Sequence, residues 1–237
     1  MKKLLGVILG IIAAAILLVA GVLVQSVDPS QRQPSVDTYT FEDTLANRHY
    51  DVDSLKVVIG ELKGLPTGFE VAAALAYSAF PQLKDAKIDM VLTDDGAPME
   101  STVDIWSLFG PRSNRQYLIL LNDARDSYMN PILLRSLPFD AQVGILAHEL
   151  GHIAYYHKMN ILQFGKWGLK YLDDDEFRAT HERTTDLMPV YHGLGSQIYQ
   201  YAYFVRKDSS CAEFYEQGKD FMDKYYLTDE ELLDSMK

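Results

Sequence analysis

The spacing of apolar residues changes along the chain, and the change predicts two kinds of element. In residues 51–63, apolar positions recur three and four residues apart, as they do on one face of a helix. Residues 68–80 form a second apolar run, and Thr67 and Glu70 at its start fit a capping box. The pattern therefore predicts two helices, one on each side of Pro66.

The next segment has the shorter period that is typical of β-strands. Residues 87–93 are predicted to be a strand that ends at an Asp-Asp-Gly turn. Residues 102–109 alternate apolar and polar positions, and residues 115–122 are rich in strand-forming side chains. The stretch 110–114 between them, Gly-Pro-Arg-Ser-Asn, has the composition of a turn. The last two strands are therefore predicted to form a hairpin.

Helical spacing returns after residue 140 and continues to the C-terminus. The predicted helices are 140–158, about 174–188, 196–207, 211–225 and 228–236. Strands that come first and helices that follow are typical of an α+β domain. We expect a small mixed or antiparallel sheet and a helical C-terminal half.

The N-terminal residues differ from the rest of the chain. Residues 4–24 contain no charged residue, and their length matches the roughly 20 residues that a helix needs to cross a bilayer. Lys2 and Lys3 precede this run, so the positive-inside rule keeps the N-terminus in the cytoplasm and exports the remainder. The run is longer than the apolar core of a cleaved signal peptide, which is usually about 7–15 residues.

These observations predict three parts. Residues 1–24 are a transmembrane anchor or signal segment, residues 25–40 are a linker that contains two prolines, and residues 41–237 are the folded domain. The expected location is membrane-anchored, with the domain exported to the periplasm or the cell exterior. Secretion after cleavage of a signal peptide is the alternative.

Composition narrows the classes of function. The 237 residues carry a formal net charge of −11, which argues against a nucleic-acid partner because phosphate binding needs clustered Lys and Arg. Cys211 is the only cysteine, so the chain cannot form an intramolecular disulfide or a zinc site built from cysteines alone.

One motif carries chemistry. His148, Glu149 and His152 form the pattern H-E-x-x-H within the predicted helix 140–158. Positions four apart on a helix are separated by about 40° around its axis, so both imidazoles can bind one zinc ion. Glu149 is turned by about 100° and can take a proton from a water on the metal without being a ligand.

A catalytic zinc needs a third protein ligand. The spacing H-E-x-x-H-x-x-G-x-x-H does not occur, because Tyr155 and Lys158 stand where Gly and His are required. Glu182 and Asp186 offer a carboxylate pair four residues apart on a later predicted helix. Glu182 can ligate the zinc, and Asp186 can hydrogen-bond the far nitrogen of a ligating histidine.

This combination resembles the gluzincins, zinc peptidases in which H-E-x-x-H is followed by a glutamate in E-x-x-x-D. It is most similar to the HtpX/CAAX-prenyl-protease type, over roughly residues 115–195. The resemblance implies a zincin-like domain, His148, His152 and Glu182 as ligands, Glu149 as general base and Asp186 behind a ligand. It also implies that an edge strand before the motif helix, here residues 115–122, pairs with an extended peptide substrate.

The chain departs from that type in two ways. Thr185 precedes the aspartate where the family often has Ala, and one apolar span stands where its members usually have several. The ImmA/IrrE-like regulators, a second gluzincin group, also combine HELGH with a glutamate about thirty residues later. Those proteins are expected to be cytosolic, which the apolar run of this chain argues against.

The oxyanion that develops during peptide hydrolysis usually needs a hydrogen-bond donor besides zinc. Pro189 is predicted to break or kink the helix that carries Glu182, so residues 189–195 can fold back towards the metal. Tyr191 and His192 are the candidate donors in that segment, and an ordinary surface turn is the alternative. We select His192 as the candidate catalytic residue.

Two hypotheses for the function follow. The first is a membrane-anchored zinc metalloendopeptidase that acts on peptide or protein substrates with Glu149 as general base. The second is a catalytically inactive zincin-like domain that serves binding or scaffolding at the outer face of the membrane. The presence of Glu149 favours the first, because a binding protein has no need of that base.

Overall fold

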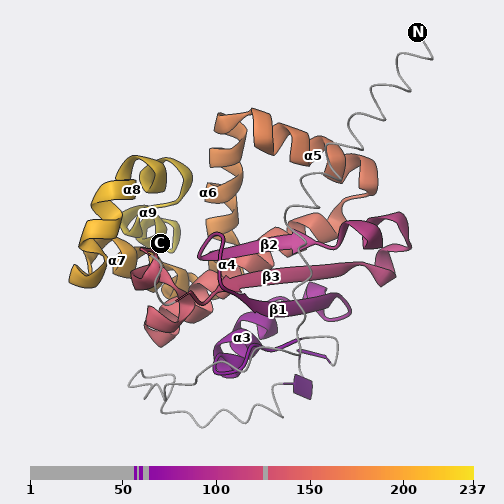
Figure 1. The fold of residues 1–237 in the computed structure, drawn as a ribbon, viewed down its shortest axis with the longest axis horizontal. Coiled ribbons are helices and arrows are strands. Elements are labelled where there is room, and N and C mark those ends of the chain that lie inside the picture. The colour runs from indigo at the N-terminus through magenta and orange to yellow at the C-terminus, as the bar shows by residue number, and fades with distance from the viewer. Residues whose placement is uncertain (1–55, 58, 61–63, 125–127) are drawn as a thin grey trace. The chain divides into compact units, whose positions relative to one another are not determined.

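The computed structural model describes residues 56, 57, 59, 60, 64–124 and 128–237 (Figure 1). They all belong to one compact unit, Val36–Lys237. The apolar run 4–24, the linker 25–40 and most of the predicted helix 51–63 lie outside the described residues. Among the helices that the structure does describe, none combines the length and the hydropathy that crossing a bilayer requires.

The sheet has three strands and is mixed. They are β1 (Lys87–Thr93), β2 (Met99–Val103) and β3 (Gln116–Asn122), in the spatial order β1-β3-β2. β3 runs parallel to β1 and antiparallel to β2. The prediction of an α+β domain with a small sheet is confirmed, and the described residues are mostly helical.

The predicted hairpin joins the right two segments, but its first strand is misplaced: β2 begins at Met99, three residues before the predicted start, and ends six residues before the predicted end. β2 and β3 do pair, with Val103 opposite Tyr117. The strand predicted over residues 102–109 ends at Val103, however, and Ile105–Phe109 form a 3₁₀ helix. The cause is local: the Asp104 carboxylate accepts a hydrogen bond from the backbone N–H of Trp106 at 3.0 Å, which caps a helical turn.

The expectation that residues 115–122 form the edge strand is wrong. β3 is the central strand, and its backbone groups are already paired on both sides, so no peptide can be added to it. Tyr117, Ile119 and Leu121 are buried along it, as suits a central position. β2 is an edge strand of this sheet and packs against the motif helix, so the edge beside the motif is β2.

The described helices follow the predictions closely, with one omission. α3 (Glu70–Ser78) lies within the range 68–80, but no side chain caps it, and the Glu70 carboxylate instead accepts from the Gly68 N–H at 2.8 Å. The sequence analysis did not predict α5 (Ile161–Asp173). The others are α4 (Phe139–Lys158), α6 (Asp175–Tyr191), α7 (Gly195–Lys207), α8 (Ala212–Tyr225) and α9 (Asp229–Ser235).

Pro189 does not end α6 as expected. It lies inside the helix, which continues to Tyr191. Gly193, two residues after the end of the helix, has a φ of 80°, which suits glycine. The Leu194 N–H donates a hydrogen bond back to the Pro189 carbonyl at 2.8 Å.

The motif helix α4 is the centre of the domain. It packs against α3 and β2 as well as against α6 and α7 (Figure 1). Small residues allow this close packing: a Cβ on Gly144 would stand 2.3 Å from the carbonyl oxygen of Gln197 on α7. Because its neighbours bury α4 on several sides, the polar side chains of the motif lie inside the protein.

Candidate metal centre

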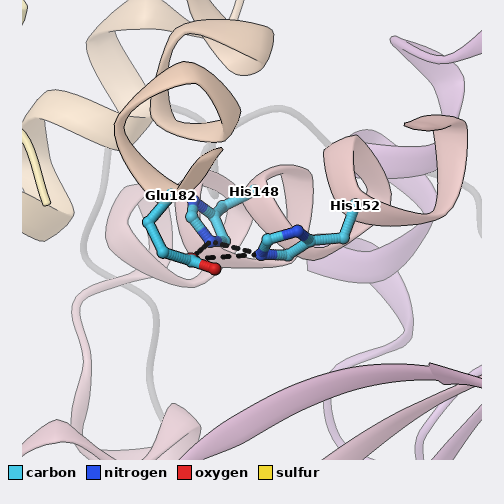
Figure 2. A group of neighbouring side chains, drawn as sticks. All are labelled: His148, His152 and Glu182. Carbon is cyan, nitrogen blue, oxygen red and sulfur yellow. Dashed lines mark hydrogen bonds and ion pairs between the residues drawn. The ribbon is translucent and has the colours of Figure 1, made fainter. Parts of the chain in front are cut away.

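Three polar side chains from two helices converge in the interior. α4 carries His148 and His152, whose Nε2 atoms lie 3.1 Å apart. α6 carries Glu182, whose Oε2 lies 3.4 Å from the first of these nitrogens and 3.3 Å from the second. Figure 2 shows the three side chains pointing towards one another. All three residues are buried, so the cluster could hold a metal ion within the protein.

The spacing of the three donor atoms suits one metal ion. Ligand atoms about 2.0–2.1 Å from a tetrahedral ion lie about 3.3 Å from one another. The three separations here, 3.1, 3.3 and 3.4 Å, are close to that value. Two imidazole nitrogens and one carboxylate oxygen also form a donor set that leaves one tetrahedral position open for water or substrate. The three residues therefore fit a single metal ion.

The electrostatics of the cluster favour a positive charge between these groups. Burial opposes the charged form of Glu182, but hydrogen bonds from both imidazoles outweigh burial and hold the pKa of its carboxyl far below its usual range. Burial also opposes the charged form of His148, but Asp186 and Glu182 raise its pKa well above the usual value. A metal cation satisfies the same carboxylates, so metal and proton compete for this cluster.

Asp186 stands behind the first histidine. Its Oδ1 lies 2.8 Å from Nδ1 of His148, on the side of the ring that faces away from the cluster. Its Oδ2 accepts a hydrogen bond from the backbone N–H of Leu227 at 2.7 Å. Because the carboxylate is held at both oxygens, it fixes the orientation of the imidazole and leaves Nε2 free to bind a metal.

Two further partners escaped the sequence analysis. Nε2 of His181 lies 3.3 Å from Nδ1 of His152. Burial lowers the pKa of His181 to about 4, and electrostatic repulsion from His152 contributes to the same shift. The Tyr171 hydroxyl donates to Oε1 of Glu182 at 2.6 Å. No spacing rule identified these residues, since His181 merely adjoins Glu182 and Tyr171 lies on the unpredicted helix α5.

A glycine in the motif brings the two helices together. A Cβ on Gly151 would meet Cβ of Met188 at 3.0 Å and Cγ2 of Thr185 at 3.1 Å, both on α6. Thr185, at the position where the resembled family often has Ala, is buried here, and its hydroxyl donates to the His181 carbonyl at 2.9 Å. The threonine is thus accommodated without an unpaired polar group.

Glu149 is not one of the three clustered residues, and its side chain contacts the sheet. The Ser101 hydroxyl, on β2, lies 2.5 Å from Oε2 of Glu149 and 2.9 Å from its backbone carbonyl oxygen. Glu149 is buried and adjoins His148 in the chain. One side chain of the edge strand therefore holds the carboxylate that the sequence analysis selected as general base.

His192 has other neighbours than those expected. Its ring stacks on Phe80, with centroids 4.3 Å apart, and its Nε2 lies 3.2 Å from Nε2 of Gln82. Both partners belong to the segment that follows α3. α6 continues through Pro189 to Tyr191, and His192 is the residue that caps its C-terminal end. The contacts recorded for its ring therefore give no support to His192 as a catalytic residue.

Comparisons of this chain with models of protein families, with characterised proteins and with solved structures found no significant match.

Proposed function

We propose that this protein is a zinc-dependent metallopeptidase of the gluzincin type. One observation carries the proposal: His148, His152 and Glu182 converge on one side of α4, while Glu149 is held on the side that faces a sheet edge. Metal-assisted hydrolysis needs a base that lies near the metal but is not one of its ligands. Glu149 adjoins His148 and lies close enough for its charge to help raise the pKa of that imidazole, so it is suited to this role. A zincin-like fold is part of the same proposal.

Zinc is the metal that this donor set fits best. Histidine nitrogens favour zinc over magnesium and calcium, which prefer oxygen ligands. Two histidines and one glutamate are a recurrent ligand set of catalytic zinc. When bound, zinc supplies a Lewis acid and lowers the pKa of water at its open position towards about 7.

The residues of the chain divide the remaining work. Asp186, His181 and Tyr171 hold the three ligands in place through the hydrogen bonds described above. The Glu149 carboxylate accepts the proton of the attacking water and passes it to the nitrogen of the leaving amine. Ser101 orients that carboxylate through one of its oxygens and leaves the other for the water.

The substrate is placed at the edge of β2 that no other described strand pairs with. Backbone N–H and C=O groups of Met99–Val103 that β3 does not use can pair with an extended peptide. Because Ser101 lies in the middle of this strand, a peptide paired there passes beside Glu149. The substrate we propose is therefore an extended segment of a polypeptide. The proposed setting is a membrane-anchored chain whose folded domain is exported.

Cleavage of an unfolded protein substrate by the full chain tests the proposal. Replacing a general base costs about 10²–10⁴-fold in turnover, so Glu149→Gln should lose activity by that factor while it retains zinc. Glu176→Gln removes an exposed carboxylate from the first turn of α6 and is the matched control. Equal cleavage by the wild type and Glu149→Gln would contradict the mechanism. Binding without cleavage in either chain would favour the inactive binding domain.

A further inference from the structure

Two segments that are distant in the sequence meet at one end of the domain. Residues 104–115 connect β2 to β3, and residues 159 and 160 connect α4 to α5. Nη2 of Arg112 donates to the Lys158 carbonyl at 3.0 Å, and Nη1 of Arg115 donates to the Met159 carbonyl at 2.5 Å. The exposed side chains at this junction are Trp106, Phe109, Arg112, Lys158, Ile161 and Leu162, which we call the end patch.

The apolar members of the end patch are unusually exposed. Trp106 is 69% exposed, Phe109 72% and Leu162 74%. The two aromatic rings lie 6.2 Å apart, so they form one apolar surface. The Asp104 cap on the Trp106 N–H holds the 3₁₀ turn in shape. Because most of their surface remains in water, these two rings contribute little to the stability of the fold. Exposed apolar side chains that lie together mark contact surfaces.

The charge of the end patch is opposite to that of the whole chain. Arg112 and Lys158 are exposed at the junction, and Lys166 is exposed farther along α5, whereas the chain has a formal net charge of −11. Asp104 is the nearby acid, and its carboxylate accepts the Trp106 N–H. Basic residues are thus gathered beside exposed aromatic and aliphatic side chains.

We propose that the end patch docks on the surface of an anionic lipid bilayer. In this arrangement Trp106, Phe109 and Leu162 insert at the boundary between headgroups and acyl chains, and Arg112 and Lys158 contact lipid phosphates. Large apolar side chains flanked by Lys and Arg are the composition of interfacial membrane-binding surfaces. The inference goes beyond the proposed peptidase activity, and it rests on the membrane anchor that the proposed function includes.

The sequence outside the described residues favours a bilayer over a protein partner. Residues 4–24 are predicted to cross a membrane, and the 31 residues between this run and Lys56, the first described residue, can reach no more than about 110 Å when fully extended. Such a tether keeps the domain close to a lipid surface. Lysine is also depleted at protein–protein interfaces, whereas it is favoured beside anionic headgroups.

The two tryptophans of the chain provide a direct test in the full-length protein. Trp106 is in the end patch, whereas Trp167 packs among Tyr156, Phe164 and Tyr171. Trp167→Phe leaves Trp106 as the sole emitter, and Trp106→Phe leaves Trp167. Each variant is reconstituted in phosphatidylglycerol/phosphatidylcholine vesicles with or without lipids brominated near the headgroup.

We expect brominated lipids to reduce the emission of Trp106 about twofold or more and to leave that of Trp167 nearly unchanged. Equal emission of Trp106 in both kinds of vesicle would overturn the proposal. Failure of the chain to associate with vesicles would overturn it as well. High salt should weaken the quenching, because it screens the contacts of Arg112 and Lys158 with phosphates.

A charge reversal sharpens the test. In the Trp167→Phe chain, replacing Arg112 and Lys158 together by Glu should abolish the quenching. Replacing Lys207 and Lys219 by Glu changes the net charge by the same amount but away from the end patch, so the quenching should remain. Quenching that survived the first pair would exclude an anionic surface as the occupant. Two results together would overturn the proposal and assign the end patch to a second copy of the chain. The protein would form a dimer in detergent that Phe109→Asp dissociates, and the emission of Trp106 would not be quenched in vesicles.

Discussion

The two sides of helix α4 differ in what they hold. On the side facing α6, the ligand cluster is buried and each ligand has an outer partner, such as Asp186 behind His148. On the side facing β2, Glu149 bonds Ser101, which is half-buried on an edge strand. In the function that we propose, the α6 side binds the metal and the β2 side carries the general base. Variants on the two sides should therefore fail in different ways.

The largest expected effect is loss of metal from the α6 side. Glu182→Ala removes the one carboxylate of the cluster and leaves two imidazoles, so the zinc affinity should fall by more than about a thousandfold. Competition with a chromophoric chelator measures the affinity. Glu176→Ala, on an exposed position of the same helix, should keep the wild-type value. Undiminished zinc binding by Glu182→Ala would remove that residue from the ligand set.

The next effect belongs to the residue behind His148. Asp186→Asn keeps the size of the side chain but loses the charge that orients the imidazole, so zinc affinity should fall about 10–100-fold. The control is Asp220→Asn, at an exposed position of α8, which should behave like the wild type. If Asp186→Asn instead reduced turnover with zinc affinity intact, the proposed division between the two sides would be contradicted.

The smallest effect is on the β2 side. Ser101→Ala removes one hydrogen bond from Glu149, so turnover should fall about fivefold, as expected for about 1 kcal/mol. Zinc affinity should not change, because Ser101 does not touch the ligands. Steady-state cleavage and chelator competition on the same preparation distinguish the two quantities. Ser196→Ala, at an exposed site on α7, is the control. A loss of zinc in Ser101→Ala would show that the two sides are coupled.

Local elements were predictable from the sequence because local periodicity encodes them. The range 140–158 differs from α4 by one residue, and the geometry of a helix alone places His148 and His152 on one face. α5 was missed although its sequence is amphipathic. Its apolar residues share one broad side, and the opposite side carries Gln163, Lys166 and Lys170.

Long-range relations were harder to predict. The order β1-β3-β2 places the last strand in the centre. The continuous apolar run of β3 and the polar residues of β2 agree with this order, but the sequence analysis did not use the contrast. His181 and Tyr171 contact the cluster because α5 and α6 pack there, which a spacing rule does not encode. The prediction for His192 assumed that Pro189 breaks or kinks the helix, whereas α6 continues through Pro189 to Tyr191.

Zinc content and coordination of the purified full-length chain test the central claim most directly. Elemental mass spectrometry should find about one zinc per chain, and zinc K-edge absorption should show two imidazole nitrogens and carboxylate oxygen at about 2.0–2.2 Å. Folded protein that was never exposed to a chelator and contains no zinc would contradict the claim. Zinc held by sulfur at about 2.3 Å would contradict it equally, because His148, His152 and Glu182 contain no sulfur.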